Sequence, residues 1–156
     1  MRIEWKKLLI CIGFPLAVGG LSALLTSGNM DLYKEINQPT LAPPAWLFPV
    51  VWTILYALMG IGAGIVTGKS RLTEADSAIN LMIAQLVVNF FWPLIFFNTQ
   101  AYGFALLWIL LLLVLVIWMA LEFKKISPFA AYLQIPYIVW LLFATYLNTA
   151  VWYLNQ

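Results

Sequence analysis

Charged residues divide the chain into long stretches that carry no charge. None occurs from Leu8 to Met30, from Ile36 to Gly68, from Ser77 to Leu121 or from Ile126 to Gln156. A helix needs about 20 apolar residues to span a bilayer, and the third stretch is about twice that length. It contains the polar run Asn98-Thr99-Gln100, which suits a tight turn between two spans. The pattern therefore predicts five transmembrane helices.

The expected fold is all-α, an integral membrane bundle of five transmembrane helices forming a single domain over residues 1–156. A transmembrane β-barrel is the competing architecture, but it needs strands of about ten residues with alternating polarity. Residues 106–116 are continuously apolar instead. We expect a long first loop at about 27–44 and helices at about 7–26, 45–67, 77–97, 101–123 and 130–153.

The first apolar run also has features of a secretory signal peptide. Met1–Lys7 is basic, and the small residues Gly19, Gly20, Ser22 and Ala23 follow the apolar core. A cleaved signal is therefore the alternative to a first span. The run reaches about 20 residues, beyond the usual signal core of about 7–15, which favours a retained helix.

Composition narrows the function classes. The chain of 156 residues is 64% hydrophobic and 9% charged, with a net charge of +2, against about 25% charged residues in soluble domains. These values exclude a soluble enzyme, a disordered chain and a nucleic-acid-binding protein, and they imply a lipid bilayer as the surroundings. Histidine is absent and Cys11 is the single cysteine, so we expect no metal site, no disulfide within the chain and no required cofactor.

Basic residues predict the orientation. With five spans, Lys34 lies alone on one side, and the other side holds seven of the eight Lys and Arg residues: Arg2, Lys6, Lys7, Lys69, Arg71, Lys124 and Lys125. The positive-inside rule then places the N-terminus in the cytoplasm and the C-terminus outside. We expect a multi-pass protein of a bacterial cell membrane.

Aromatic and neutral polar residues form stripes inside three of the predicted helices. No charge lies in a helix core, which argues against a voltage sensor, a proton pump or an ion-coupled transporter. The stripes are Gln85, Asn89, Trp92 and Phe96 in the third helix, Trp52 and Tyr56 in the second, and Tyr137, Trp140, Ala144 and Asn148 in the fifth.

These stripes have two interpretations. Amides are costly to expose to lipid, so Gln85, Asn89 and Asn148 should face the bundle interior. They could serve only as interhelical hydrogen bonds, worth about 0.6–2 kcal/mol each. Alternatively, aromatic walls with few polar groups form a pocket for a flat, mostly apolar ligand. Trp5, Trp46 and Trp152 lie near helix ends, where interfacial anchoring explains them, whereas Trp52, Trp92 and Trp140 lie further in.

The first loop, one proline and a glycine repeat each predict a further structural feature. The first loop, with Tyr33, is either a lid over a site or a passive connector. Pro136 precedes Tyr137 and Trp140, so a bend there would aim both rings inward. The repeat of Gly60, Gly64 and Gly68 makes a smooth groove for packing within the chain or in a homodimer, and packing within the chain is the commoner use.

Three segments resemble the motifs of the TspO/MBR family, the tryptophan-rich sensory proteins and the mitochondrial translocator protein. They are Pro39–Gly60, which contains Trp46, Pro49, Trp52 and Tyr56; Asn89–Phe97, which contains Trp92 and the pair Phe96-Phe97; and Pro136–Asn148, which contains Trp140 and Ala144. The resemblance covers most of the chain. It implies a five-helix bundle, often dimeric, with a pocket under the first loop.

The resemblance also implies ligands and site residues. Family ligands include porphyrins, haem, sterols in some members, and synthetic isoquinoline carboxamides and benzodiazepines. The pocket residues it implies are Tyr33, Trp52, Tyr56, Asn89, Trp92, Trp140, Ala144 and Asn148. Tyr137 joins them as a ligand-binding candidate because it shares the stripe of Trp140.

The expected function is a membrane receptor or sensor that binds a porphyrin such as protoporphyrin IX and regulates tetrapyrrole levels. One alternative is an enzyme that degrades porphyrin in light, with Trp52 and Trp140 as the catalytic indoles implied by the resemblance. The other is a porphyrin or lipid transporter. No basic residue follows Tyr146 or Tyr153, which argues against the sterol motif, and the absence of histidine favours metal-free porphyrin over haem.

Overall fold

The computed structural model describes residues 4–69 and 72–156, and all regular structure in them is helical. Five helical segments are long and apolar enough to cross a membrane: Trp5–Asn29, Leu47–Lys69, Ala75–Asn98, Tyr102–Ile126 and Pro128–Leu154. The predicted all-α bundle of five spans is confirmed. The protein is therefore a multi-pass integral membrane protein whose outer surface contacts lipid.

The five spans contain shorter helical pieces at their ends. In chain order the elements are α1 (Trp5–Thr26), a 3₁₀ turn (Ser27–Asn29), α2 (Met30–Glu35), α3 (Leu47–Lys69), α4 (Leu72–Pro93), a π-helix (Leu94–Asn98), α5 (Tyr102–Ile126), α6 (Pro128–Tyr132) and α7 (Ile135–Leu154). The segment expected as the first loop thus contains the 3₁₀ turn and α2. A turn with Gln100 at a φ of 55° joins the third and fourth spans.

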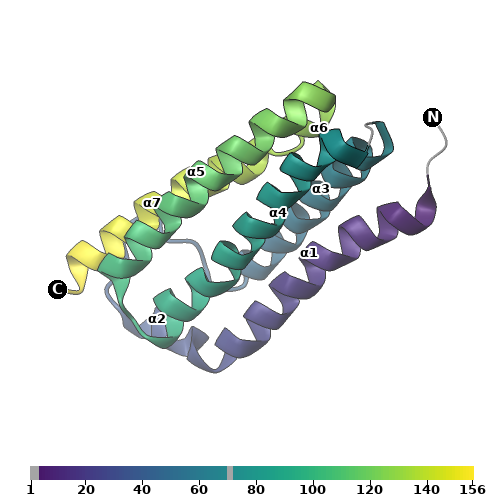
Figure 1. The fold of residues 1–156 in the computed structure, drawn as a ribbon. Helices are drawn as coiled ribbons and strands as arrows, with labels where there is room; N and C mark the ends of the chain where they lie inside the picture. The colour runs from purple at the N-terminus through teal and green to yellow at the C-terminus, as the bar shows by residue number, and fades with distance from the viewer. Residues whose placement is uncertain (1–3, 70–71) are drawn as a thin grey trace.

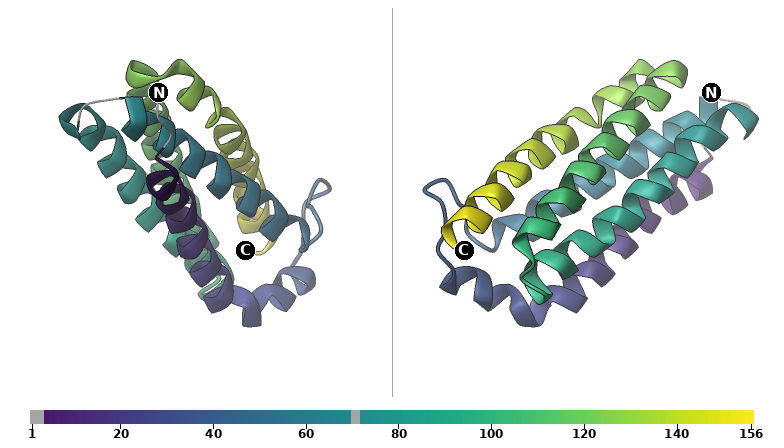
Figure 2. Two further views of the ribbon diagram at one scale, coloured as in Figure 1. Left: turned by 90° about the vertical axis from the view of Figure 1, so that its right-hand side faces the viewer. Right: turned by 60° about the vertical axis from the view of Figure 1, so that its left-hand side comes forward.

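The long helices lie along one common direction, with α1 at the edge of the bundle (Figure 1). α1 packs mainly on α3, and α5 packs on both α4 and α7. The two termini lie at opposite ends of the bundle, as an odd number of spans requires. Figure 2 shows α2 and the chain that follows it at the same end as the C-terminus.

Basic residues gather at the opposite end from α2. Lys6 and Lys7 belong to the start of α1, and Lys124 and Lys125 to the end of α5. The Nζ of Lys69, at the end of α3, donates to the Oγ of Ser127 across 3.5 Å, so these helix ends meet. Arg2 and Arg71, which also entered the orientation argument, lie outside the described residues. Which end faces the cytoplasm stays a prediction.

The fifth span differs from the expected helix at 130–153 because it is interrupted. Pro136 lies in the first turn of α7, where its missing N–H removes no helical hydrogen bond. The interruption therefore comes before this proline, and no bend occurs at it inside a continuous helix. Beside the break, the Nε2 of the buried Gln134 donates to the carbonyl of Leu58 in α3 across 3.3 Å. Gly62 makes room for it, because a Cβ there would lie 2.5 Å from that nitrogen.

Two glycines of the repeat in α3 allow α1 to approach its backbone. A Cβ on Gly60 would lie 2.4 Å from the Cα of Ile12, and a Cβ on Gly64 would lie 2.5 Å from the Cδ1 of Leu8. A Cβ on Gly68 would meet nothing within 4 Å. At Gly60 and Gly64 the groove therefore serves packing within the chain, which is the commoner of its two expected uses.

Replacing Gly60 by Ala should loosen the contact between α1 and α3. The new methyl group would meet backbone atoms, and forcing a tight interface apart costs about 1–3 kcal/mol. Gly68→Ala is the matched control in the same helix, and its open surroundings predict no loss and a gain of up to about 1 kcal/mol from helix propensity. Unfolding in mixed micelles titrated with dodecyl sulfate measures both. Equal stability of the two variants would contradict the packing account.

Candidate functional site

The tryptophans predicted to lie deep in the spans differ in burial from those predicted at the ends. Trp5 and Trp46 are each 66% exposed, as expected of anchors near the lipid–water interface. Trp92 is 3% exposed, and Trp52 and Trp140 are partly buried and pack against the core. The deep tryptophans therefore face the inside of the bundle, where they can border an internal space.

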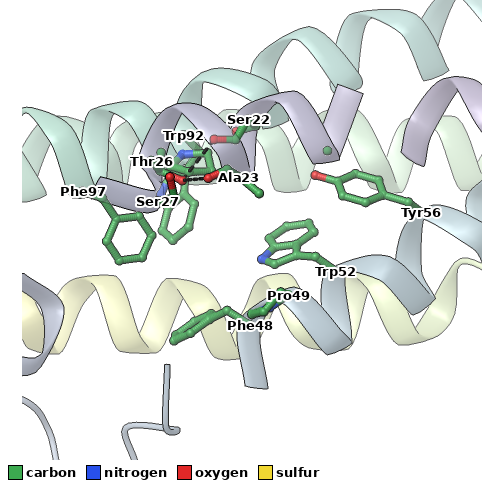
Figure 3. Close-up of a pocket in the computed structure, with 12 residues that line it drawn as sticks. Ser22, Ala23, Thr26, Ser27, Phe48, Pro49, Trp52, Tyr56, Trp92 and Phe97 are labelled. Carbon is green, nitrogen blue, oxygen red and sulfur yellow. Dashed lines mark hydrogen bonds between the residues drawn. The ribbon is translucent and has the colours of Figure 1, made fainter. Parts of the chain in front are cut away.

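A cavity of about 310 Å³ lies between α1, α3 and the end of α4 (Figure 3). The last turns of α1 contribute Gly19, Ser22, Ala23, Thr26 and the adjacent Ser27. The first turns of α3 contribute Phe48, Pro49, Trp52 and Tyr56. The end of α4 and the π-helix contribute Trp92, Pro93 and Phe97. All these side chains are uncharged, so the space is apolar with a few hydroxyl and indole groups.

The cavity exists because small residues of α1 face large rings of α3 and α4. The ring of Tyr56 lies directly against Gly19, where a Cβ would come within 2.1 Å of its Cε2 atom. The indole of Trp52 stacks on the Tyr56 ring, with centroids 5.6 Å apart and planes at 27°. Figure 3 shows Trp52 projecting into the space between α1 and the Phe48–Pro49 segment. These two stacked rings form one wall of the cavity.

Hydrogen bonds hold the end of α1 against α4. The buried Ser22 donates its hydroxyl to the carbonyl of Phe90 across 2.9 Å. Further along, the Nδ2 of Asn98 donates to the carbonyl of Leu25 across 3.1 Å, and the Nδ2 of Asn29 donates to the Oδ1 of Asn98 across 2.7 Å. The α1–α4 side of the cavity is thus closed by polar contacts, which are specific in direction.

The π-helix after Pro93 turns two consecutive phenylalanines inward. A π-helix is wider than an α-helix and often occurs at functional sites. Phe96 is 1% exposed and stacks on Trp92 at 5.0 Å. Its neighbour Phe97 is also buried and lines the cavity. In this way one short segment supplies both a core ring and a cavity wall.

A chain of hydrogen bonds starts at Tyr56 in the cavity wall and crosses the bundle. The hydroxyl of Tyr56 donates to the Oδ1 of Asn89 across 2.9 Å, and the Nδ2 of Asn89 donates to the hydroxyl of Tyr137. That hydroxyl donates to the Oε1 of Gln85 across 2.8 Å, and the Nε2 of Gln85 contacts the Sδ of Met59 at 3.0 Å. All five residues are buried. The chain ties α3, α4 and α7 together.

A second polar link joins α4, α7 and α5. The indole N–H of Trp92 donates to the Oδ1 of Asn148 across 3.1 Å. The Nδ2 of Asn148 then donates to the carbonyl of Tyr102 at the start of α5, across 2.8 Å. The prediction that Gln85, Asn89 and Asn148 face the interior is confirmed, because each is at most 1% exposed.

The predicted ligand-binding residues therefore fall into separate groups. Trp52, Tyr56 and Trp92 line the cavity. Asn89, Tyr137 and Asn148 form the polar links between helices, and Ala144 is buried without lining this cavity. The sequence offered interhelical hydrogen bonds and a pocket as alternatives, and the structure contains both. The polar links and the cavity share Tyr56 and Trp92. Whether any of these residues binds a ligand stays a prediction.

Tyr33 of α2 closes the end of the cavity without lining it. Its ring meets Phe48 at 5.4 Å and Phe97 at 6.0 Å, both edge to face. Its hydroxyl donates to the carbonyl of Pro43 across 3.3 Å. Burial raises the pKa of Tyr33 to about 12, so the hydroxyl stays protonated and remains a donor at all physiological pH values.

Trp140 of α7 lies behind the wall of the cavity. Its indole meets Phe48 at 5.9 Å and Trp52 at 6.4 Å, in both cases edge to face. Its Nε1 atom is buried and has no hydrogen-bond partner within the described part of the chain. The two indoles proposed as catalytic are therefore adjacent, with Trp52 at the cavity and Trp140 one ring further away.

The contribution of α1 to the cavity is absent from the sequence-based predictions. Gly19, Ser22, Ala23 and Thr26 recur at the spacing of one helix face, which was a usable signal. Gly19, Ser22 and Ala23 were interpreted instead as small residues near a possible signal cleavage site. Phe48, Pro49, Pro93 and Phe97 were visible in the motifs but were not assigned to the pocket.

The described residues contain no cluster of three or more His, Cys, Asp or Glu side chains that would suit a metal ion. The lining of the cavity itself offers hydroxyls, an indole N–H and aromatic faces. Such a site can enclose a flat apolar molecule and donate a hydrogen bond to it.

Comparison with known proteins identifies the family. The TspO/MBR family profile matches residues 11–154. The chain belongs to the TspO/MBR family. It is 36% identical to the tryptophan-rich protein TspO of Chlorobaculum tepidum over 157 residues, covering 99% of each chain. It is 36% identical to the translocator protein of Bos taurus over 153 residues, covering 93% of this chain and 89% of the relative.

A third relative extends the comparison among bacteria. The tryptophan-rich sensory protein of Cereibacter sphaeroides is 30% identical over 155 residues, covering 99% of this chain and 95% of the relative. In this TspO/MBR protein, the cavity and both polar links lie within the matched residues 11–154. The site is therefore part of the shared domain.

A double-mutant cycle between Tyr56 and Asn89 should show direct coupling. Tyr56→Phe and Asn89→Leu each remove one partner of a buried hydrogen bond, which costs about 1–3 kcal/mol. The double variant should lose less stability than the sum of the two single losses. The difference, which is the coupling energy, should be about 0.6 and at most about 1.7 kcal/mol, the range found between membrane helices. Dodecyl sulfate unfolding measures the cycle.

The control cycle pairs Tyr56→Phe with Asn148→Leu. Asn148 belongs to the second polar link and makes no hydrogen bond to Tyr56, so these two changes should add independently. Coupling of equal size in both cycles would show that the loss is general loosening of the bundle, and would contradict a specific Tyr56–Asn89 bond.

Proposed function

We propose that the protein is a membrane receptor for flat, mostly apolar molecules of the porphyrin class, which bind in the cavity between α1, α3 and α4. The observation that carries the proposal is the stacked pair of Trp52 and Tyr56 facing an uncharged, aromatic-walled space. Aromatic walls with few polar groups favour planar apolar ligands. Regulation of tetrapyrrole levels would follow from such binding.

The size of the cavity limits how the ligand is held. Its volume of about 310 Å³ lies at the lower end of the usual range for small-molecule pockets, about 300–1,000 Å³. A porphyrin macrocycle would therefore be enclosed only in part. The remainder would project through the side of the cavity where Ala23 and Pro49 are exposed.

The charge of the site limits the chemistry of the enclosed part. Because none of the described residues that line the cavity carries a positive charge, an ionised carboxylate buried there would lose its hydration without compensation. The enclosed edge should therefore be neutral, and ionised groups should remain near the membrane surface. The indole N–H of Trp52 has no hydrogen-bond partner in the described part of the chain. It is available to an acceptor atom of the ligand.

Quenching of tryptophan fluorescence by protoporphyrin IX tests the receptor proposal. The wild-type protein in lipid nanodiscs should show saturable quenching at micromolar concentration. Trp52→Leu removes the indole of the stacked pair from the cavity wall and should raise Kd about tenfold, or about 1.4 kcal/mol. Trp118→Leu is the matched control, because Trp118 is 54% exposed on α5 and does not line the cavity. Absence of saturable quenching in the wild type would refute the proposal.

A second candidate function is light-dependent degradation of the bound porphyrin. Trp52 borders the cavity, and Trp140 lies edge to face with it at 6.4 Å. An excited porphyrin can accept one electron from an indole in contact with it and pass that electron to dissolved O₂, which leaves an oxidised indole and superoxide. The superoxide is then the oxidant that attacks the macrocycle, and the site holds the porphyrin and the indole together. The neighbouring indole of Trp140 would then donate an electron to the oxidised indole of Trp52.

Loss of porphyrin absorbance under illumination tests this second function. Trp52→Phe should slow the loss more than Trp140→Phe, because only Trp52 borders the cavity. Trp118→Phe should leave the rate unchanged, and a dark sample should show no loss. Each variant is compared at equal porphyrin occupancy, so that weaker binding does not imitate slower chemistry. An unchanged rate in the Trp52/Trp140 double variant would exclude a role for these indoles.

A further inference from the structure

The cavity is covered at the end of the bundle that carries the first loop. Tyr33 is 2% exposed, and its ring meets Phe48 and Phe97, which both line the cavity. Phe48 and Phe97 also meet each other edge to face at 6.4 Å. These three rings cover part of the cavity at this end.

The loop above these rings is tied down on both sides of Tyr33. Before it, Asn29 donates to Asn98 at the end of the π-helix. After it, the backbone N–H of Asn37 donates to the Oδ1 of Asn155 across 3.0 Å, and the Nδ2 of Asn155 donates back to the carbonyl of Asn37 across 2.9 Å. This reciprocal pair of hydrogen bonds holds the loop against the C-terminal end of α7. Opening the loop would break these contacts together.

The side of the cavity between α1 and α3 is different. Three of its lining residues, Ala23, Ser27 and Pro49, are exposed. Their neighbours Leu24 and Val50 are exposed apolar side chains, at 71% and 48%. Ala23 and Pro49 belong to the first two membrane spans, so in a bilayer this opening faces the hydrocarbon region near one membrane surface.

The packing of α1 explains why the opening lies here. In the first half of α1 the two helices are in close contact, where Ile12 meets Gly60 and Leu8 meets Gly64. Toward the C-terminal end of α1, the rings of Tyr56 and Trp52 stand between the two helices. The helices are therefore in backbone contact at one end and separated by side chains at the other.

We propose that the ligand reaches the cavity sideways from the bilayer, between α1 and α3, while the first loop stays closed. This inference rests on the proposed receptor function. The ligand it implies is a planar molecule that dissolves in lipid, with any ionised groups held at the membrane surface. Ala23 and Pro49 form the rim of the opening, and the bilayer supplies the ligand.

Two modifications separate the lateral route from the route through the loop. The first introduces Asn37→Cys and Asn155→Cys in a Cys11→Ser background and joins the two new thiols with a short bifunctional maleimide, to lock the loop. The second is Ala23→Phe, which narrows the lateral opening; Ala17→Phe is its matched control, because Ala17 is exposed on α1 outside the cavity lining. All proteins are studied at full length in nanodiscs, with protoporphyrin dimethyl ester as the neutral, lipid-soluble probe.

Stopped-flow quenching then gives association and dissociation rates. The 37–155 crosslink should leave the association rate unchanged. Ala23→Phe should lower both the association and the dissociation rate, by about tenfold or more, because a narrowed passage slows movement in both directions. Ala17→Phe should behave as the wild type. If Ala23→Phe only fills the cavity, dissociation becomes faster, and the lateral route is overturned.

The remaining outcomes are also decisive. A crosslink that slows association about tenfold assigns access to the loop and overturns the proposal. Unchanged rates in both the crosslinked protein and Ala23→Phe overturn it as well. Failure of the underlying function is distinguishable, because the unmodified protein would then show no saturable quenching by the probe at all.

Discussion

The hydrogen bond from Tyr56 to Asn89 determines the position of the ring on which the rest of the site depends. With its hydroxyl held by α4, the Tyr56 ring lies against Gly19 of α1 and stacks on the indole of Trp52. The ring thereby sets the spacing of α1 and α3 at the cavity. In hydrocarbon the hydroxyl has no water to replace Asn89, so the ring orientation is enforced more strongly than in a soluble protein. The cavity is present because the ring, held in this orientation, keeps α1 and α3 apart.

Much of the fold follows from the sequence because lipid tolerates few alternatives. Charges cannot lie in the hydrocarbon region, so their spacing located the spans, and the cost of exposed amides placed Gln85, Asn89 and Asn148 inside. The family resemblance supplied Trp52, Tyr56 and Trp92, which do line the cavity. These inferences need only local pattern and solvent physics.

Other features depended on tertiary contacts that no pattern contains. α1 is apolar on nearly every side, so hydrophobicity alone could not show which face meets α3. Stripes showed which residues face inward, but inward-facing residues such as Asn148 and Tyr137 bond to other helices and do not line the cavity. The interruption before Pro136 occurs where Gln134 bonds to Leu58 in the middle of α3, a contact between residues far apart in the sequence. The π-helix after Pro93 likewise has no signal in the apolar pattern.

The division of the polar chain among spans bears on how the protein is assembled during synthesis. α1 and α3 are consecutive spans, so their glycine contacts can form as soon as the second has entered the bilayer. Gln85 and Asn89 enter the bilayer with the third span. Tyr137, which accepts a hydrogen bond from Asn89 and donates one to Gln85, enters only with the last span. Until then these amides lack a partner that the finished bundle provides. Insertion of the final span thus completes the polar interior, and a chain that ends before it retains unsatisfied amides that mark it as incomplete.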